Sequence, residues 1–441
     1  MKRLLSLLLC AVLALFCATT AQAAGVSITL TASEYALHYA FDAGAQDPFV
    51  ILEYATPAEK GWMMLYSEDG HFEGDVSLAY SGAGGKTSVA LTSARTTGSI
   101  GKASTTLPKA ADYQKPTGKS NAKVTDFVLT ETPEGFHYAF NAIGTDYMLL
   151  YWRSKEQTVT QPVYPDENGH YEGDVVSELT FARTQFTVQV KSGSGSMKKE
   201  ATVRKGYQAP EAPQRQEGRL SGVTVCIDAG HQENGRFVNE PIGPGLSGST
   251  SGKGGMAQGT KTNRRESIVC LEIGMLLRDE LLRQGANVVM TREDQTTFHT
   301  NIERCEIAEA GGAQIMLRLH CNNSSNHSKR GIQVYGPLNS DYAKAVADAD
   351  TYREMGQKLL DAMKTRVGMT LANSTGMVRL NDNYVGNNWA KMMCFLVEMG
   401  YLSNPAEEYL LVTPVYQQWL AEGMADGVYE IAVARGWVQA Q

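Results

Sequence analysis

Two patterns of apolar and polar residues divide the chain. Up to about residue 206, apolar residues alternate with polar ones, as in Leu37 to Phe41, and turn sequences such as Ser67 to Gly70 separate these runs. A period of two is typical of strands with one buried face. From Gly222 onwards, short apolar runs alternate with longer segments in which apolar residues recur at helical spacing. The first pattern predicts antiparallel β structure, and the second predicts an α/β domain.

The β pattern occurs twice. The stretch LHYAFDA begins at Leu37 and returns as FHYAFNA at Phe136, and HFEGDV at His71 returns as HYEGDV at His170. Both pairs are separated by 99 residues, and two matches at one offset indicate a tandem duplication. We therefore predict two sandwich-like domains that act as binding or spacing modules. Their predicted boundaries are residues 24–112 and 120–206.

Two features of these repeats allow more than one interpretation. His71 and His170 precede Glu-Gly-Asp sequences. A turn leading into a strand is expected there rather than a metal site, because one histidine with one or two carboxylates matches zinc ligand sets poorly. Trp62 and Trp152 are expected in the core, with an exposed sugar-binding platform as the alternative. The sequence does not identify the ligand of either repeat.

The second half of the chain predicts a different architecture. A polar stretch with two prolines, residues 207–219, is expected to link the repeats to an α/β domain over residues 220–438. Thr300 is a candidate N-cap and Gly285 a candidate helix stop. The alternation of strands and helices predicts a largely parallel sheet. Strands are predicted at 223–228, 286–292, 313–319, 331–336 and 392–398, and helices at 264–285, 301–312, 341–367 and from 404–407 onwards.

The N-terminus has the features of a secretory signal. Lys2 and Arg3 precede a mostly apolar run from Leu4 to Cys17, and residues 21–23 fit a small-x-small cleavage site. The apolar run is too short to span a bilayer, and no later segment is apolar enough to do so. We therefore expect residues 1–23 to be a signal peptide that is removed on export.

Charge and cysteine content exclude two further classes. The formal net charge of −7 argues against nonspecific nucleic-acid binding, because such binding requires a basic face. Five cysteines follow the signal segment, and most of them lie inside apolar runs. An odd number without clustered spacing does not indicate a disulfide framework, so buried, unpaired thiols are expected. These are Cys226, Cys270, Cys305, Cys321 and Cys394.

Four titratable residues are predicted at one edge of the sheet. His231 follows the first strand, and His320 and Glu398 each end a later strand. Glu266 lies in the first turn of a predicted helix. Ligands of parallel sheets bind at the C-terminal ends of the strands, which is also where the following helices begin. A catalytic zinc takes three protein ligands and leaves a position for water, and a free carboxylate can act as general base. A first-turn acid at Glu266 and a loop cap at His231 are the alternatives.

Five motifs occur in order along this half: IDAGHQ, RRESIVCLEIG, VVMTRED, RLHCNNS and FLVEMGYLSNPAEE. Together they resemble the zinc-dependent N-acetylmuramoyl-L-alanine amidases of bacterial cell-wall turnover, over about residues 219–437. The resemblance implies a secreted, Zn2+-dependent enzyme of the cell wall. Its substrate would be peptidoglycan, in which it would hydrolyse the amide between the muramic acid lactyl group and L-alanine.

The resemblance also assigns roles to single residues. His231, Glu266 and His320 match the zinc ligands, and Glu398 matches the catalytic glutamate. Zinc-bound water would be the nucleophile. Glu398 would take its proton and pass it to the leaving amine.

Further candidates surround these four. Asp228 either orients His231 or forms a turn. Asn322 is a candidate for supporting the ligands or contacting the substrate, and Arg292 and Arg304 are expected to be structural.

Two other features bear on the same edge. Cys321 is not expected to be a ligand, because neighbouring side chains of a strand point to opposite faces. The long glycine-rich stretch between His231 and Glu266 is expected to be a mobile loop at the rim. A zinc peptidase that cuts another stem-peptide amide, or a non-catalytic wall-binding protein, are the alternative functions.

Overall fold

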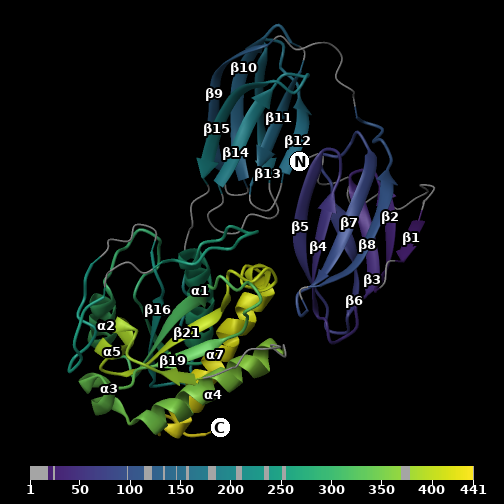
Figure 1. Ribbon diagram of the computed structural model, residues 1–441. Coiled ribbons are helices and arrows are strands. Elements are labelled where there is room, and N and C mark those ends of the chain that lie inside the picture. Colours follow the sequence, from purple (N-terminus) through teal and green to yellow (C-terminus); the bar gives the residue numbers. More distant parts are fainter. Residues whose placement is uncertain are drawn as a thin grey trace. The chain divides into compact units, whose positions relative to one another are not determined.

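The computed structural model describes residues 18–22, 25–96, 98–113, 122–132, 135–145, 147–154, 158–176, 185–204, 211–232, 238–250, 255–368 and 378–440. They divide into two compact units, an all-β unit within residues 18–204 and an α/β unit within residues 211–440 (Figure 1). Among these residues, no helix is both long and apolar enough to cross a lipid bilayer.

The all-β unit contains two repeats with the same strand arrangement. In each repeat, three antiparallel strands form one layer, to which the first repeat adds β1 (Ala18–Gln22), four form the other layer, and the apolar core lies between them. The prediction of antiparallel β structure is therefore confirmed. The first repeat consists of β2 (Ser27–Ser33), β3 (Ala36–Asp42) and β6 (His71–Ser77), opposite β4 (Phe49–Ala55), β5 (Glu59–Tyr66), β7 (Gly85–Ser93) and β8 (Ser99–Leu107). The second consists of β9 (Lys123–Thr132), β10 (Gly135–Ile143) and β13 (His170–Val176), opposite β11 (Met148–Arg153), β12 (Thr158–Val163), β14 (Gln185–Lys191) and β15 (Met197–Arg204).

The two repeats share a sheet. Strand β12 pairs antiparallel with β5 through Thr158–Lys60 and Val159–Glu59. The two four-stranded layers therefore form one eight-stranded sheet of order β15-β14-β11-β12-β5-β4-β7-β8. An unpaired edge strand is a template for aggregation, so this pairing covers an edge that each repeat would otherwise expose.

Close packing explains the repeated Glu-Gly-Asp sequence. A Cβ at Gly74 would lie 2.8 Å from the hydroxyl oxygen of Tyr39, and one at Gly173 would lie 2.7 Å from that of Tyr138. Only glycine lets the tyrosine of the neighbouring strand cross at this point. Trp62 and Trp152 are both buried in this unit, so the core interpretation of these two residues holds.

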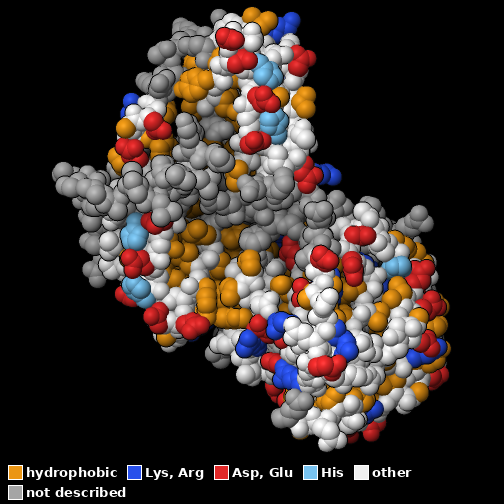
Figure 2. Space-filling view, turned by 180° about the vertical axis from the view of Figure 1, so that it is seen from behind, with side chains coloured by type: hydrophobic (Ala, Val, Ile, Leu, Met, Phe, Trp, Pro, Cys, Tyr) orange, Lys and Arg blue, Asp and Glu red, His pale blue; other side chains and the backbone are white. Residues whose placement is uncertain are grey.

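The repeated histidines lie on the surface. His71 begins β6, and its exposed ring has Nδ1 2.7 Å from Asp42 and Nε2 3.6 Å from Glu73. His170 begins β13 in the same way, with Nδ1 2.8 Å from Asn141. Figure 2 shows histidine and acidic side chains alternating on the surface of the all-β unit. Within the described ranges, neither histidine belongs to a group of three convergent metal ligands, which favours the turn-and-strand interpretation.

The predicted signal peptide, residues 1–23, lies outside the described residues except for Ala18–Gln22. These five residues form β1, which pairs with β2. The corresponding sheet of the second repeat contains only β13, β10 and β9 among the described strands. Removal of β1 would therefore leave both repeats with the same set of strands.

The sheet of the α/β unit is mixed. Its order is β17-β16-β18-β21-β19-β20, and the first four strands of this order are parallel. Strand β19 runs antiparallel to β21, whereas the other four strand pairings are parallel, so the expected largely parallel sheet is confirmed in part. The connection from β18 to β19, residues 323–332, contains no helix and is too short for a parallel crossover. The strands are β16 (Thr224–Ala229), β17 (Asn287–Met290), β18 (Ile315–Asn322), β19 (Gln333–Gly336), β20 (Val378–Leu380) and β21 (Met393–Tyr401).

Helices cover both faces of this sheet. Helices α1, α4 and α7 pack together on one face, and α2, α3 and α5 lie on the other (Figure 1). The five cysteines among the described residues are buried and free, as predicted. The helices are α1 (Glu266–Arg283), α2 (Asn301–Ala310), α3 (Asp341–Val346), α4 (Ala349–Val367), α5 (Val385–Trp389), α6 (Glu407–Leu410) and α7 (Pro414–Ala434).

Two helix ends follow the prediction and one helix does not. Helix α1 ends before Gly285, whose φ is +93°, and Thr300 caps α2 with a complete capping box. The helix predicted over residues 341–367 is instead two helices. Ala347 is extended, and the Asp348 side chain caps the first turn of α4. An aspartate that accepts from a nearby backbone N–H competes with helix continuation, and apolar spacing does not reveal this.

Candidate metal centre

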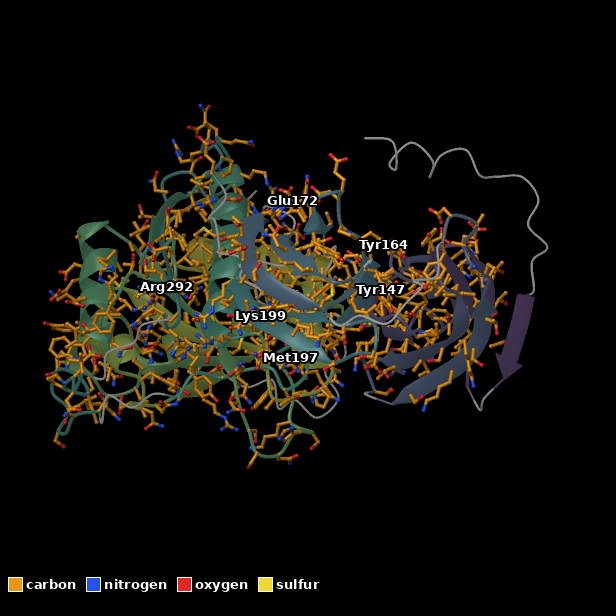
Figure 3. All side chains as sticks on the ribbon, turned by 90° about the horizontal axis from the view of Figure 1, so that it is seen from above. Tyr147, Tyr164, Glu172, Met197, Lys199 and Arg292 are labelled. Atoms are coloured by element: carbon orange, nitrogen blue, oxygen red, sulfur yellow. The ribbon has the colours of Figure 1, made fainter. Side chains whose placement is uncertain are left out.

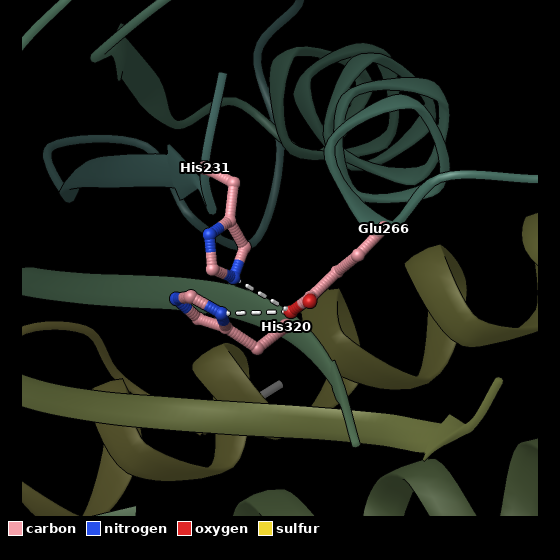
Figure 4. Close-up of side chains that lie close together, drawn as sticks. All are labelled: His231, Glu266 and His320. Atoms are coloured by element: carbon pink, nitrogen blue, oxygen red, sulfur yellow. Dashed lines mark hydrogen bonds and ion pairs between the residues drawn. The ribbon is translucent and has the colours of Figure 1, made fainter. Parts of the chain in front are cut away.

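Three side chains from three elements converge at the C-terminal edge of the sheet. His231 follows β16, Glu266 is the first residue of α1, and His320 lies on β18. His231 Nε2 lies 3.1 Å and His320 Nδ1 lies 3.0 Å from the same oxygen, Oε1 of Glu266 (Figure 4). The three candidate ligand atoms all lie within 4.8 Å of one another. Two imidazoles and one carboxylate are a donor set that suits Zn2+.

Glu266 is held by the backbone as well as by the histidines. Its Oε2 accepts from the backbone N–H of Ala257 at 2.7 Å, and its Oε1 accepts from that of Cys321 at 3.0 Å. Burial alone would raise the pKa of this carboxyl, but the hydrogen bonds and charges of His231 and His320 outweigh burial and lower it. The group is therefore an oriented carboxylate at neutral pH.

The backbone around His231 is fixed by two buried arginines. His231 has a φ of +57°, a left-handed conformation that is uncommon outside glycine and asparagine. Arg304 donates to the carbonyl of His231 at 3.2 Å. Arg292, which lies inside the α/β unit (Figure 3), donates to the carbonyls of Ala229 and Gly230 at 2.7 and 2.8 Å. Both arginines thus hold the loop that presents His231.

Asp228 contacts one of these arginines, Arg304, and a third buried arginine, Arg318. Its carboxylate pairs with Arg304 and, at 2.8 Å, with Arg318, and it accepts from the Thr291 hydroxyl at 2.8 Å. Burial would raise its pKa, but the two guanidinium groups lower it overall. Both oxygens are thus engaged away from His231. Asp228 is linked to the His231 backbone through Arg304, and its role in orienting His231 stays a prediction.

Glu398 lies in the C-terminal half of β21, three residues before the strand ends at Tyr401, and it is directly opposite His320 in the strand register. Its side chain is buried, and Oε2 has no hydrogen-bond partner among the described residues. Burial, together with the negative charge of Glu266, raises the pKa of Glu398 to about 8. A buried carboxyl without a partner is costly, and such groups concentrate at functional sites.

The four residues line one cavity of about 910 Å3. Asn322 also lines it, with its amide 3.4 Å from the side-chain oxygen of Gln333. Cys321 lines it too; its side chain is buried, its thiol is hydrogen-bonded to Cys270 of α1, and it is not one of the three convergent ligand residues. Tyr384 and Glu240 line the cavity as well, and neither was a candidate from the sequence. Both lie outside the named motifs, and only folding brings them to this edge.

The described parts of the long stretch before α1 are anchored, which differs from the expected mobile loop. The carboxylate of Glu240 accepts from the backbone N–H groups of Asn301 and Ile302, the first residues of α2. The Trp389 indole donates to the carbonyl of Pro241 at 2.8 Å. Residues 233–237 and 251–254 of this stretch lie outside the described residues.

Comparisons with known proteins find similarity to cell-wall amidases. Residues 225–430 match a family model described as N-acetylmuramoyl-L-alanine amidase. A germination-specific N-acetylmuramoyl-L-alanine amidase of Bacillus subtilis is 26% identical over 231 residues, which cover 49% of this chain and 83% of that protein. A protein of Staphylococcus aureus named "Probable cell wall amidase LytH" is 27% identical over 218 residues, which cover 48% of this chain and 60% of that one.

One solved structure has a similar extent of overlap. The apo N-acetylmuramyl-L-alanine amidase Ami1 of Mycobacterium abscessus is 21% identical with a TM-score of 0.44, covering 48% of this chain and 99% of that one. The family model matches the unit that carries His231, Glu266 and His320. The C-terminal half of this chain, residues 225–430, therefore belongs to the N-acetylmuramoyl-L-alanine amidase family.

Proposed function

We propose that the protein is a secreted, zinc-dependent N-acetylmuramoyl-L-alanine amidase. It would hydrolyse the amide between N-acetylmuramic acid and L-alanine in peptidoglycan. One observation carries this proposal. Three ligand atoms of the kind that bind zinc converge in a cavity that Glu398 also lines, and among the described residues the carboxyl oxygen Oε2 of Glu398 has no hydrogen-bond partner.

The residues present fit a zinc ion. His231 Nε2, His320 Nδ1 and Glu266 Oε1 would hold it, and the cavity leaves room on the open side for water and substrate. When bound there, Zn2+ would supply Lewis acidity to the scissile carbonyl and would lower the pKa of water. Both histidine rings already contact the same oxygen of Glu266, so the three metal ligands are arranged before any ion binds.

Glu398 would move the proton. Its raised pKa makes the carboxylate a stronger base, and the positive charge of a bound ion would oppose this shift and favour the ionised form. The carboxylate would take a proton from the attacking water and deliver it to the leaving amine nitrogen of L-alanine. Burial keeps bulk water from competing for this proton.

Two other functions use parts of the same arrangement. A zinc peptidase would need the same ligands but would cut another amide of the stem peptide. A non-catalytic wall-binding protein would not need a buried carboxyl group near the metal ligands. One oxygen of Glu398 has no hydrogen-bond partner among the described residues, and this argues against the non-catalytic alternative.

Product analysis tests these alternatives. The full-length protein, loaded with Zn2+, is incubated with purified peptidoglycan, and soluble products are identified by mass spectrometry. We expect stem peptides with a free N-terminal L-alanine and an intact glycan. Glu398→Gln should abolish release while zinc content stays unchanged. Peptides that begin at a later residue would identify a peptidase, and no release by the wild type would refute the amidase proposal.

We propose that the rest of the chain brings the catalytic domain to the cell wall. Residues 1–23 would direct export to the cell wall, and the repeats at 24–112 and 120–206 would bind the wall or another protein. The linker at 207–219 would connect them to the catalytic domain at 220–438. The net charge of −7 supports a partner other than nucleic acid.

A further inference from the structure

A hairpin that ends on the proposed metal ligand leads into α1. The backbone N–H of Glu266 donates to the carbonyl of Ala257 at 2.9 Å, and the N–H of Ala257 donates to the Glu266 carboxylate at 2.7 Å. Gln258 and Arg265 form an antiparallel bridge next to this pair. The side chain of Arg265, the N-cap residue, makes no capping bond to α1. The hairpin over residues 257–266 therefore orients the Glu266 carboxylate from the side of its backbone.

A buried carboxylate from a distant part of the chain holds the tip of this hairpin. Glu408 lies in α6 and is fully buried. Its Oε1 accepts from the Thr260 hydroxyl at 2.9 Å. Its Oε2 accepts from the backbone N–H groups of Lys261 and Thr262 at 2.9 and 3.1 Å. These contacts join segments that are 146 to 148 residues apart, so the tip is tied to α6.

The chemistry of this contact exceeds what packing requires. Burying a carboxylate is costly unless hydrogen bonds compensate, and a neutral side chain in the same place would avoid much of that cost. Hydrogen bonds to an ionised acceptor are stronger than those between neutral groups. Within the described part of the chain, every hydrogen bond that Glu408 accepts comes from the hairpin tip. The carboxylate therefore acts on the segment that leads to Glu266.

The neighbouring carboxylate of α6 holds a different part of the site. Glu407 is also buried, and its two oxygens accept from the backbone N–H groups of Gly331 and Tyr401, both at 2.8 Å. Tyr401 ends β21, the strand that carries Glu398. Two buried carboxylates of one helix thus hold two separate segments. Glu407 is therefore a matched comparison for Glu408.

We propose that Glu408 is a positioning residue of the metal centre. By holding the hairpin tip, it fixes the backbone at Ala257 and thereby the direction of the Glu266 carboxylate towards the two histidines. Glu408 is not among the described residues that line the cavity, so it acts through Glu266. The inference rests on the proposed function and deepens it, since it concerns the affinity of the same site for Zn2+.

The zinc affinity of the full-length protein tests this role, measured by competition with a chromophoric chelator. Glu408→Gln keeps the shape of the side chain but replaces one acceptor oxygen with an NH2 group, which cannot accept from Lys261 or Thr262. We expect the Kd for Zn2+ to rise at least about tenfold, the loss typical of residues that support metal ligands. Glu407→Gln changes a buried carboxylate outside the hairpin and should keep the Kd within about twofold of the wild type.

Two further measurements on the metal-free protein separate positioning from stability. The unfolding temperature should fall in both glutamine variants, because both leave buried N–H groups without an acceptor. Hydrogen exchange of the Ala257 amide should become faster only in Glu408→Gln, because only this variant loosens the hairpin whose Ala257 N–H donates to Glu266. A purely structural role would lower the stability of Glu408→Gln and leave both the exchange and the Kd unchanged.

A milder variant decides the matter if Glu408→Gln fails to fold. Thr260 is exposed, and Thr260→Val removes one of the donors to Glu408 while the carboxylate stays in place. The Kd for Zn2+ should then rise about threefold, in keeping with the loss of one hydrogen bond. An unchanged Kd in this variant would overturn the inference.

Failure of this inference and failure of the proposed function give different results. An unchanged Kd in folded Glu408→Gln, or an equal rise in Glu407→Gln, would overturn the inference alone. If the wild type binds zinc but releases no peptide with N-terminal L-alanine, only the proposed function fails, and the comparison of Kd values still decides the inference. A wild type without measurable zinc affinity would refute both.

Discussion

At the scale of single residues, the pairing of buried charges distinguishes residues that stabilise the fold from residues that serve catalysis. Both oxygens of Asp228 are engaged by Arg304, Arg318 and Thr291, so this carboxylate is fully satisfied. Glu398 is also buried, but its Oε2 has no partner among the described residues. A paired buried charge holds structure together, whereas an unpaired one is costly and is retained where chemistry needs it.

The substitution Glu266→Gln should remove the metal. It takes away the negative charge between the two histidines, and the amide nitrogen of the new side chain would face either an imidazole or the Ala257 N–H. We expect zinc content after dialysis to fall at least about tenfold, measured by elemental analysis of the protein. Glu309→Gln is the control, because Glu309 is exposed and pairs with Lys391 on the surface. Full zinc occupancy in Glu266→Gln would contradict the assignment.

Asp228→Asn should destabilise the α/β unit. The change leaves two buried guanidinium groups without their counter-charge, which costs about 3–5 kcal/mol. Urea denaturation of the full-length protein measures the free energy of unfolding. Asp279→Asn breaks a partly exposed pair with Arg278 and should cost less than about 1 kcal/mol. Equal stability of the two variants would show that the buried pairs contribute little.

At the scale of elements, glycines permit the close approach of helices. A Cβ at Gly427 of α7 would lie 2.8 Å from the Cα of Leu359 in α4, and one at Gly423 would lie 2.8 Å from the Cα of Met363. The contacted atoms are backbone, so a whole helix would have to move. At Gly274 of α1, the nearest atom would be 3.5 Å away, an ordinary contact.

Gly427→Ala and Gly274→Ala should therefore change stability in opposite directions. Alanine raises helix propensity by about 1 kcal/mol at either position. At Gly427 the steric conflict with Leu359 outweighs this gain, and we expect a net loss of about 1–2 kcal/mol. At Gly274 the propensity gain should remain, so that variant is as stable as the wild type or more so. Thermal unfolding compares them, and a stabilised Gly427→Ala would refute the packing argument.

At the scale of the whole molecule, the all-β unit consists of two repeats with a similar strand arrangement, which an edge pairing joins. Each repeat keeps its own core, and the only described strand pairing between them is that of β12 with β5. Strand β1 is the exception to the symmetry of the repeats, and it lies within the predicted signal peptide.

The mature protein should begin at Ala24. Cleavage after Ala23 would remove β1 and leave the first repeat with the three strands that its counterpart uses. Intact-mass measurement of the protein secreted by a bacterial host tests this. Ala23→Leu places a bulky residue at the cleavage site and should leave the signal attached. Secreted wild type that still carries residues 1–23 would contradict the prediction.

Local patterns in the sequence were enough to predict much of this protein. Period-two alternation indicated the strands of the repeats, the shared offset indicated a duplication, and Thr300 marked the start of α2. His231, His320 and Glu398 were identified because strand ends and motifs are local features, and the structure brings them into one cavity with Glu266. Their roles in zinc binding and proton transfer stay predictions.

Only the tertiary structure decided the rest. Several features depend on segments that are far apart in the chain. They are the direction of β19, the partners of Asp228, the anchoring by Glu240 and the position of Tyr384. Asp228 and Arg318, for example, are 90 residues apart. Apolar spacing records which face of an element is buried, but not which other element buries it. Sequence patterns therefore determined the elements and the candidate ligands, while packing between distant segments determined the supports and walls of the site.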